Sequence, residues 1–233
     1  MTPVPPVPPV RTESLEVRRT ALVAMLGPDG PALHGVRELW YVLHGYAMRA
    51  VPFLEGFRAV AADARLLVAP EALSRFYDGT RSAGAHKDAP VLASWMTRDE
   101  RDAEISDYLA YLDAVHATVV ARLGGAAPRV TVFGFSQGGA TAARWVASGR
   151  VHVARLVVWG SGMAPELDLA TPGSAIRRPE TVFVVGATDK YITPKVVTTE
   201  TDRLRAAGFP FRLLTFEGGH RLDDDVLRQL TSP

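Results

Sequence analysis

Ser136 lies in a segment whose glycine spacing suits a nucleophile. The segment GFSQGG at 134–139 has the G-x-S-x-G pattern of a nucleophile elbow. An apolar, strand-like run, Arg129–Phe135, leads into it, and an alanine-rich, helix-like stretch, 137–148, follows. In such an elbow the serine occupies a strained strand-to-helix turn, and glycines let neighbouring backbone approach closely. The pattern therefore predicts a serine hydroxyl that attacks a carbonyl carbon.

A serine hydroxyl needs a base, because a neutral alcohol is a weak nucleophile near pH 7. His220 is the candidate base, since the turn 217–219 after the last strand-like run can bring its imidazole across the sheet end. Asp189, which follows the strand-like run 181–185, is the candidate acid that orients the imidazole and stabilises its protonated form. Asp168, in the loop after the preceding run, is the alternative acid.

Acyl transfer also needs hydrogen-bond donors aimed at the oxygen that becomes negatively charged. One candidate is the backbone N–H of Gln137, directly after the serine. The other is the backbone N–H of Tyr46, in the turn LHGYA at 43–47, which ends the apolar run Glu38–Leu43. His44 in this turn is expected to support the loop and not to transfer protons.

The elements that position these residues are apolar runs separated by helix-like stretches. Because the runs are continuous and not alternating, they predict an α/β fold with a mostly parallel central sheet covered by helices on both faces. In such sheets the site lies at the carboxyl ends of the strands. A capping box at Thr97 and Glu100 is expected to start the longest helix. The expected strands are 15–25, Glu38–Leu43, 65–69, Arg129–Phe135, 154–159, 181–185 and 211–216, and the expected helices are 48–64, 97 to the glycines at 124–125, 137–148, 194–207 and 223–230.

The composition is that of a soluble chain with a substantial core. Of its 233 residues 47% are hydrophobic and 22% are charged, with 26 basic residues against 25 acidic ones and a net charge of +1. This balance excludes a largely disordered chain and gives no field that would recruit nucleic acid or an anionic membrane. The absence of cysteine excludes a thiol nucleophile and a zinc-thiolate site. We expect a cytoplasmic monomer or homodimer that does not insert stably into membranes.

The chain divides into a short tail and one expected domain. Residues 1–10 alternate proline and valine, which predicts an extended tail without a core of its own. The tail lacks the basic start and the cleavage site of a signal peptide, and no other stretch is apolar enough to span a bilayer. We expect residues 11–233 to form a single domain, with 71–96 as an irregular excursion, or small cap, near the active site.

The chain resembles the phospholipase/carboxylesterase branch of the α/β-hydrolases, which includes bacterial carboxylesterases and acyl-protein thioesterases. The segment GFSQGG, the turn LHG at 43–45 and the order Ser136, Asp189, His220 carry the resemblance, which extends over residues 15–230. It implies an α/β-hydrolase fold and a serine hydrolase without cofactor or metal. It also implies that the triad and oxyanion roles fall on the residues named above.

Apolar residues in loops near the strand ends are candidates for lining the substrate pocket. They are Trp95, Met96, Met163 and Tyr191. The segment ASWMT at 93–97 also resembles a stretch that borders the acyl pocket in a group of predicted esterases. If these side chains line the site, the substrate is a small ester with an apolar acyl or aryl group; otherwise they seal the edge of the core.

The leading functional hypothesis is hydrolysis of carboxylic esters through an acyl-enzyme on Ser136. The same triad would serve an acyl thioesterase or a lysophospholipase. A non-catalytic binding protein that retains the hydrolase fold is the alternative of another class. A metallohydrolase is not expected, because the chain has no H-E-x-x-H motif and no cluster of ligands at metal spacing.

Overall fold

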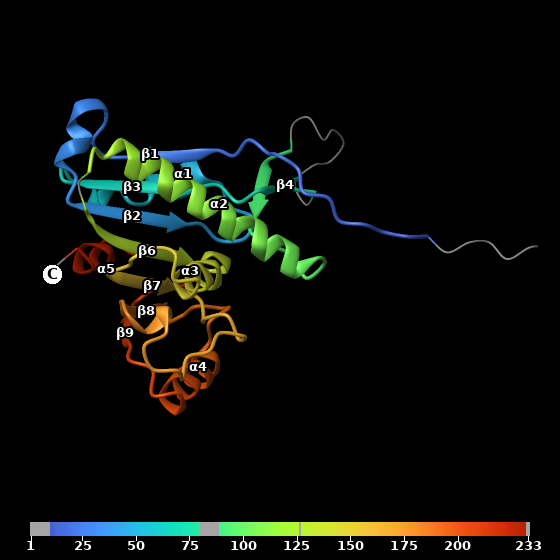
Figure 1. Ribbon diagram of the computed structural model, residues 1–233. Helices are drawn as coiled ribbons and strands as arrows, with labels where there is room; N and C mark the ends of the chain where they lie inside the picture. The colour runs from blue at the N-terminus through green and yellow to red at the C-terminus, as the bar shows by residue number, and fades with distance from the viewer. Residues whose placement is uncertain (1–9, 80–88, 126, 232–233) are drawn as a thin grey trace, which may run out of the picture.

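A seven-stranded sheet forms the centre of the computed structural model, which describes residues 10–79, 89–125 and 127–231 (Figure 1). The strand order is β1-β3-β2-β6-β7-β8-β9. β1 runs antiparallel to β3, and the other neighbouring strands are parallel, which confirms the predicted sheet. The strands are β1 (Val23–Leu26), β2 (Glu38–Leu43), β3 (Arg65–Pro70), β6 (Arg129–Phe135), β7 (Arg155–Trp159), β8 (Glu180–Gly186) and β9 (Arg212–Phe216).

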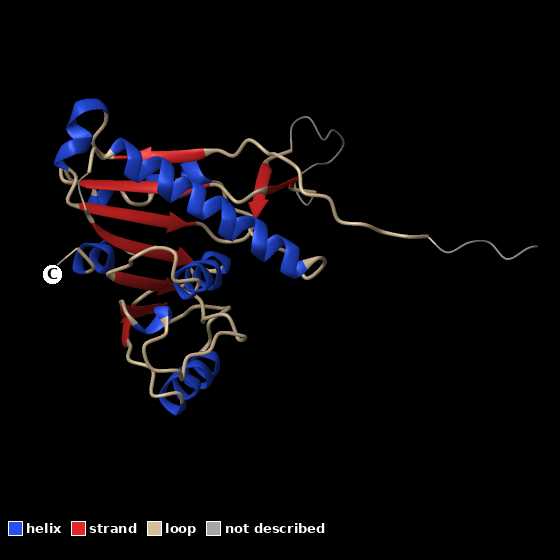
Figure 2. Cartoon of the chain, viewed as in Figure 1, coloured by secondary structure: helices blue, strands red, loops and turns tan. Residues whose placement is uncertain are grey.

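Helices cover both faces of this sheet (Figure 2). The helices α2 (Arg101–Arg122), α3 (Gln137–Ala147) and α4 (Pro194–Ala206) contribute to the core on one face, and α1 (Ala50–Glu55) and α5 (Asp224–Gln229) to the core on the other. Along β2, Tyr41 joins the first core and its neighbours Trp40 and Val42 join the second. Because both faces are buried, consecutive positions must be apolar. None of the described helices has the length and apolar character needed to cross a membrane.

Two predicted elements are shorter in the structure. The expected strand 15–25 is limited to Val23–Leu26, which is the stretch that pairs with β3, and the residues before it are largely exposed. The expected helix 48–64 is broken into α1 and a 3₁₀ turn, Arg58–Val60. Pro52 lies in the first turn of α1, where a missing N–H breaks no intrahelical hydrogen bond.

The predicted capping box at the start of α2 is wrong. The helix begins at Arg101, and Glu100 precedes it with a positive φ of 48° and no capping hydrogen bond from its side chain. The carboxylate of Glu104, in the first helical turn, reaches back and accepts a hydrogen bond from the N–H of Thr97. The contact between Thr97 and Glu104 thus takes the place of the predicted capping box between Thr97 and Glu100.

The segment 71–96 is more regular than predicted. It contains β4 (Ser74–Tyr77) and β5 (Val91–Ser94), which form a two-stranded antiparallel sheet. An antiparallel bridge between Met48 and Ala93 places this small sheet beside the turn that follows β2. Residues 80–88 of the segment and residues 1–9 of the expected tail lie outside the described residues.

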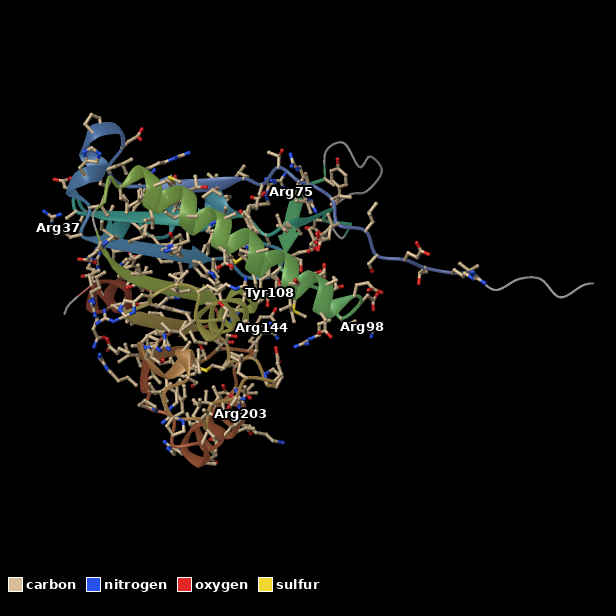
Figure 3. The ribbon with its side chains drawn as sticks, viewed as in Figure 1. Arg37, Arg75, Arg98, Tyr108, Arg144 and Arg203 are labelled. Atoms are coloured by element: carbon tan, nitrogen blue, oxygen red, sulfur yellow. The ribbon has the colours of Figure 1, made fainter. Side chains whose placement is uncertain are left out.

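An ion pair between a buried arginine and an exposed glutamate joins α3 to the loop after β7. Arg144 is only 8% exposed and pairs with Glu166, whose carboxylate also contacts Arg101 at 2.9 Å. The guanidinium of Arg144 donates to the hydroxyl of Tyr108 at 3.2 Å, and the two labelled side chains lie next to each other in Figure 3. Burial raises the pKa of Glu166, but the hydrogen bond and charge of Arg144 together with Arg101 outweigh it and lower the pKa to about 2.

This depressed pKa predicts how stability depends on pH. Because the ordinary pKa is 4.5, the Glu166 carboxylate stabilises the fold above that pH, and its contribution is lost as the pH falls towards 2. We expect Glu166→Gln to be less stable at neutral pH and to lose less free energy of unfolding between pH 4.5 and 2 than the wild type, as measured by chemical denaturation. Asp202→Asn, which removes an exposed pair with Arg205, should keep the wild-type slope. Equal slopes in wild type and Glu166→Gln would contradict this account.

Candidate active site

Ser136 occupies the single residue between β6 and α3, with φ 53° and ψ −121°. Such a conformation in a residue other than glycine costs about 1–3 kcal/mol. The neighbouring glycines make it possible: a Cβ on Gly134 would lie 2.1 Å from the carbonyl oxygen of Gly138, and one on Gly138 would lie 2.3 Å from that of Leu43. The Ser136 N–H donates to the carbonyl of Trp159 at 2.8 Å, which fixes the turn against β7. The structure therefore has the strained turn that the sequence predicts.

Asp189 and His220 form a direct hydrogen bond, with 2.7 Å between Oδ2 and Nδ1. The other carboxylate oxygen accepts the N–H groups of Tyr191 at 2.8 Å and Ile192 at 3.0 Å. Burial raises the pKa of Asp189, but these backbone donors and His220 together lower it below its ordinary value. An ionised carboxylate only accepts, so the Nδ1 atom of His220 carries a proton, and in a neutral imidazole the Nε2 atom then has the free lone pair.

The loops after β8 and β9, which carry these two residues, are tied to each other. The N–H of Thr188 donates to the carbonyl of Gly218 at 2.9 Å, and the N–H of Ala187 donates to that of Phe216 at 2.8 Å. The imidazole itself packs against Phe135 and makes a T-shaped contact with Tyr191, with 4.8 Å between ring centroids in both cases. Backbone bonds and ring contacts thus hold His220 in one orientation.

Ser136 and His220 line the same cleft, which has a volume of about 650 Å³. Among the described residues the Ser136 hydroxyl has no hydrogen-bond partner, and the contact between a nucleophile and its base often tightens only when substrate binds. The rest of the cleft wall is mainly apolar or aromatic. It consists of Gly45, Tyr46, Met48, Pro52, Phe53, Gly56, Phe135, Tyr191, Arg221 and Leu222.

The turn after β2 lies directly against the serine. A Cβ on Gly45 would lie 3.1 Å from the Cβ of Ser136, so the backbone leading to Tyr46 closely approaches the nucleophile. Within the described part of the chain the Tyr46 N–H has no acceptor. The N–H of Gln137 belongs to the first turn of α3, where helix geometry leaves N–H groups without intrahelical acceptors. The two expected oxyanion donors are therefore both available beside Ser136.

His44 is fully buried and holds this turn. Its Nε2 accepts the N–H of Ala72 at 3.0 Å, so its Nδ1 carries the proton and donates to the carbonyl of Gly45 at 2.7 Å. Burial lowers the pKa of His44, although the bond to Gly45 opposes the shift, and the ring is neutral. That carbonyl shares a planar peptide group with the N–H of Tyr46, so His44 also orients this N–H.

Only one of the four expected substrate contacts lines the cleft. Tyr191 is 72% exposed and lies beside His220, as expected. Trp95 and Met163 are 2% and 5% exposed and belong to the core, and Met96 is half-buried with its sulfur 3.6 Å from Arg144. The expectation that these three residues line the cleft is wrong, because they lie in the core or pack against it.

The alternative acid, Asp168, has a local role. It is exposed, and its Oδ1 accepts the N–H groups of Ala170 and Thr171 in its own loop. Asp189 is the carboxylate that contacts His220. Asp189 contacts the histidine because its loop follows β8, which is paired with β9, the strand before His220.

Gly160 is a site residue that the sequence argument missed. It follows β7 with φ +57°, and a Cβ there would lie 2.9 Å from the Cε1 of His220. A side chain at this position would occupy the space of the imidazole. The Gly-Ser-Gly sequence at 160–162, directly after a predicted strand, could have indicated a close approach of backbone at the site.

Comparison with known proteins identifies the family of the chain. The model of the family described as "Serine hydrolase (FSH1)" matches residues 32–223. The chain belongs to the FSH1 serine hydrolase family. No curated protein matches the sequence.

Solved structures similar to this FSH1 hydrolase include esterase PE8, acyl-protein thioesterase 2 from Zea mays and a phospholipase/carboxylesterase from Dyadobacter fermentans DSM 18053. Esterase PE8 is 21% identical, with a TM-score of 0.63 over 91% of this chain and 97% of that one. The maize protein is 17% identical, with a TM-score of 0.65 over 91% and 98%. The Dyadobacter protein is 16% identical, with a TM-score of 0.64 over 92% and 96%. These likenesses confirm the expected α/β-hydrolase fold.

Gly160→Ala tests whether the space beside the imidazole matters to this FSH1 hydrolase. We expect it to slow the reaction with a fluorophosphonate probe at least about tenfold, because a misplaced catalytic group loses rate steeply. Gly208→Ala is the matched control, since Gly208 has φ +58° but no atom within 4 Å of an added Cβ. It should lose stability through backbone strain and keep its labelling rate. Equal labelling rates in the two variants would show that Gly160 does not position His220.

Proposed function

We propose that this serine hydrolase is a carboxylesterase that cleaves esters through an acyl-enzyme on Ser136. The observation that carries the proposal is the 2.7 Å bond between Asp189 and His220, in the cleft that the strained Ser136 also lines. The Oγ of Ser136 attacks the ester carbonyl while the Nε2 of His220 takes its proton. Asp189 stabilises the imidazolium, which then protonates the departing alcohol.

The second half of the reaction reverses these roles. The negative oxygen of each tetrahedral intermediate accepts hydrogen bonds from the N–H groups of Tyr46 and Gln137. A water molecule, deprotonated by His220, attacks the acyl carbon and releases the carboxylic acid, and Ser136 recovers its proton. These reaction steps need neither a metal nor an organic cofactor.

The cleft favours esters whose acyl group is apolar or aromatic. Arg221 is the one charged residue in its described wall. Its guanidinium is already engaged by the carbonyls of Leu222 and Glu217 and by the carboxylate of Asp223, at 2.9, 3.2 and 3.2 Å. A carboxylate on the substrate would therefore enter an apolar cleft without a free cation to pair with. An acyl thioesterase or lysophospholipase with this same triad is the second candidate.

Replacement of the nucleophile tests the chemistry. We expect Ser136→Ala to lower the kcat for p-nitrophenyl esters by about 10³-fold or more, because loss of a triad member leaves only binding and the oxyanion donors. It should also abolish labelling by a fluorophosphonate probe. Ser148→Ala, at the far end of α3, should retain both activities. A folded wild-type protein that is neither labelled nor active would support the non-catalytic alternative.

A matched substrate panel tests the specificity. We expect kcat/KM to rise with the length of a neutral acyl chain until the cleft is filled. A chain of equal length that ends in a carboxylate should react at least about tenfold more slowly, because burying an unpaired charge is costly. Thioesters and lysophospholipids of the same acyl length complete the panel. Preference for the thioester or lysophospholipid would favour the second candidate, and preference for the carboxylate would contradict the proposed substrate class.

A further inference from the structure

The side-chain amide of Gln137 is bonded at both ends to the loop after β5. Its Oε1 accepts the N–H of Trp95 at 2.9 Å, and its Nε2 donates to the carbonyl of Met96 at 2.8 Å. The hydroxyl of Ser94 lies within hydrogen-bond distance of both amide atoms, at 3.3 and 3.2 Å. The first residue of α3 therefore holds this loop through its side chain, independently of its backbone N–H.

The same loop holds the turn that carries Tyr46. The indole N–H of the buried Trp95 donates to the carbonyl of His44 at 2.8 Å. On the other side of Tyr46, the N–H of Ala47 donates to the carbonyl of Ala93 at 2.9 Å, and the N–H of Ala93 donates to the carbonyl of Met48 at 3.2 Å. The turn is thus fixed just before and just after Tyr46.

These contacts connect the two oxyanion donors by a continuous path. One donor is the backbone N–H of Gln137. The other is the N–H of Tyr46, whose turn is held by Trp95, and Trp95 is in turn held by the side chain of Gln137. We propose that the Gln137 amide is a positioning group that, through Trp95, holds the Tyr46 N–H at the distance from the Gln137 N–H that an oxyanion requires. This inference rests on the proposed function, because it assumes that an oxyanion forms between these N–H groups.

The path predicts a particular kinetic effect. Oxyanion donors must lie about 2.7–3.1 Å from the charged oxygen, and a displacement of about 1 Å can lower the rate about 10²-fold. The ground-state carbonyl carries little charge, so its binding depends much less on these donors. Loosening the turn should therefore lower kcat and leave KM almost unchanged.

Two near-isosteric substitutions break the path at different points. Gln137→Met removes both amide bonds to the loop, and Trp95→Phe removes the indole donor while keeping an aromatic ring in the core. We expect each to lower kcat about 10- to 100-fold with KM within about twofold of the wild type. Because they interrupt the same path, the double variant should be no slower than the slower single variant.

Matched controls separate positioning from general damage. Gln229→Met changes the other glutamine of the chain, on α5, and Trp145→Phe removes an indole bond of 2.9 Å to Asp113 at the far end of α3. Both should keep the wild-type kcat. A kcat of Gln137→Met within about threefold of the wild type, or losses that multiply in the double variant, would overturn the proposal.

Hydrogen exchange of the segment 44–48 distinguishes this inference from the proposed function. It should be faster in Gln137→Met and Trp95→Phe than in the wild type and in both controls, whether or not the protein hydrolyses esters. Unchanged exchange overturns the positioning path even in an active enzyme, whereas an inactive wild type with the expected exchange pattern overturns only the proposed chemistry. If Gln137→Met does not fold, Gln137→Glu, which keeps the acceptor for Trp95 and loses the donation to Met96, should show the same changes to a smaller degree.

Discussion

The turn at Ser136 is the constraint on which the rest of the site depends. Ser136 is the single residue between β6 and α3, so the end of β6 and the first turn of α3 lie against each other. Only glycine fits at Gly134 and Gly138, because a Cβ at either position would collide with backbone. The turn is anchored to both neighbouring strands, by the bond from Ser136 to Trp159 of β7 and by the packing of Gly138 on the carbonyls that end β2. These contacts offset the strain of about 1–3 kcal/mol at the serine.

The groups around this turn come from two halves of the sheet that are held separately. Asp189 and His220 lie on the loops after β8 and β9, which are bonded to each other through backbone groups. The turn of Tyr46 lies on the other side, after β2, and is held by His44 and by the loop after β5. The proposed base and the proposed oxyanion donor on Tyr46 are therefore each held by their own contacts, without direct contact between them.

The sequence predicts much of this arrangement for physical reasons. Strands buried on both faces must be apolar at every position, so β2, β6 and β8 are visible as continuous runs. The glycines at 134 and 138 are required by the turn itself, and so they mark the serine. In contrast, the sequence does not show whether an apolar loop residue such as Trp95 faces the cleft or the core, because both places favour the same side chain. The start of α2 was predicted wrongly for a different reason: Glu104 accepts a hydrogen bond from Thr97, seven positions away, which a local capping pattern does not include.

In the proposed reaction, Ser136 carries the acyl group between two half-reactions. The most direct measurement is rapid acid quenching of the wild-type protein during turnover of a p-nitrophenyl ester, followed by peptide mapping by mass spectrometry. The mass of one acyl group should appear on the peptide that contains Ser136 and on no other peptide. Ester turnover without any acylated peptide, or with the acyl group on a different residue, would contradict the proposed reaction.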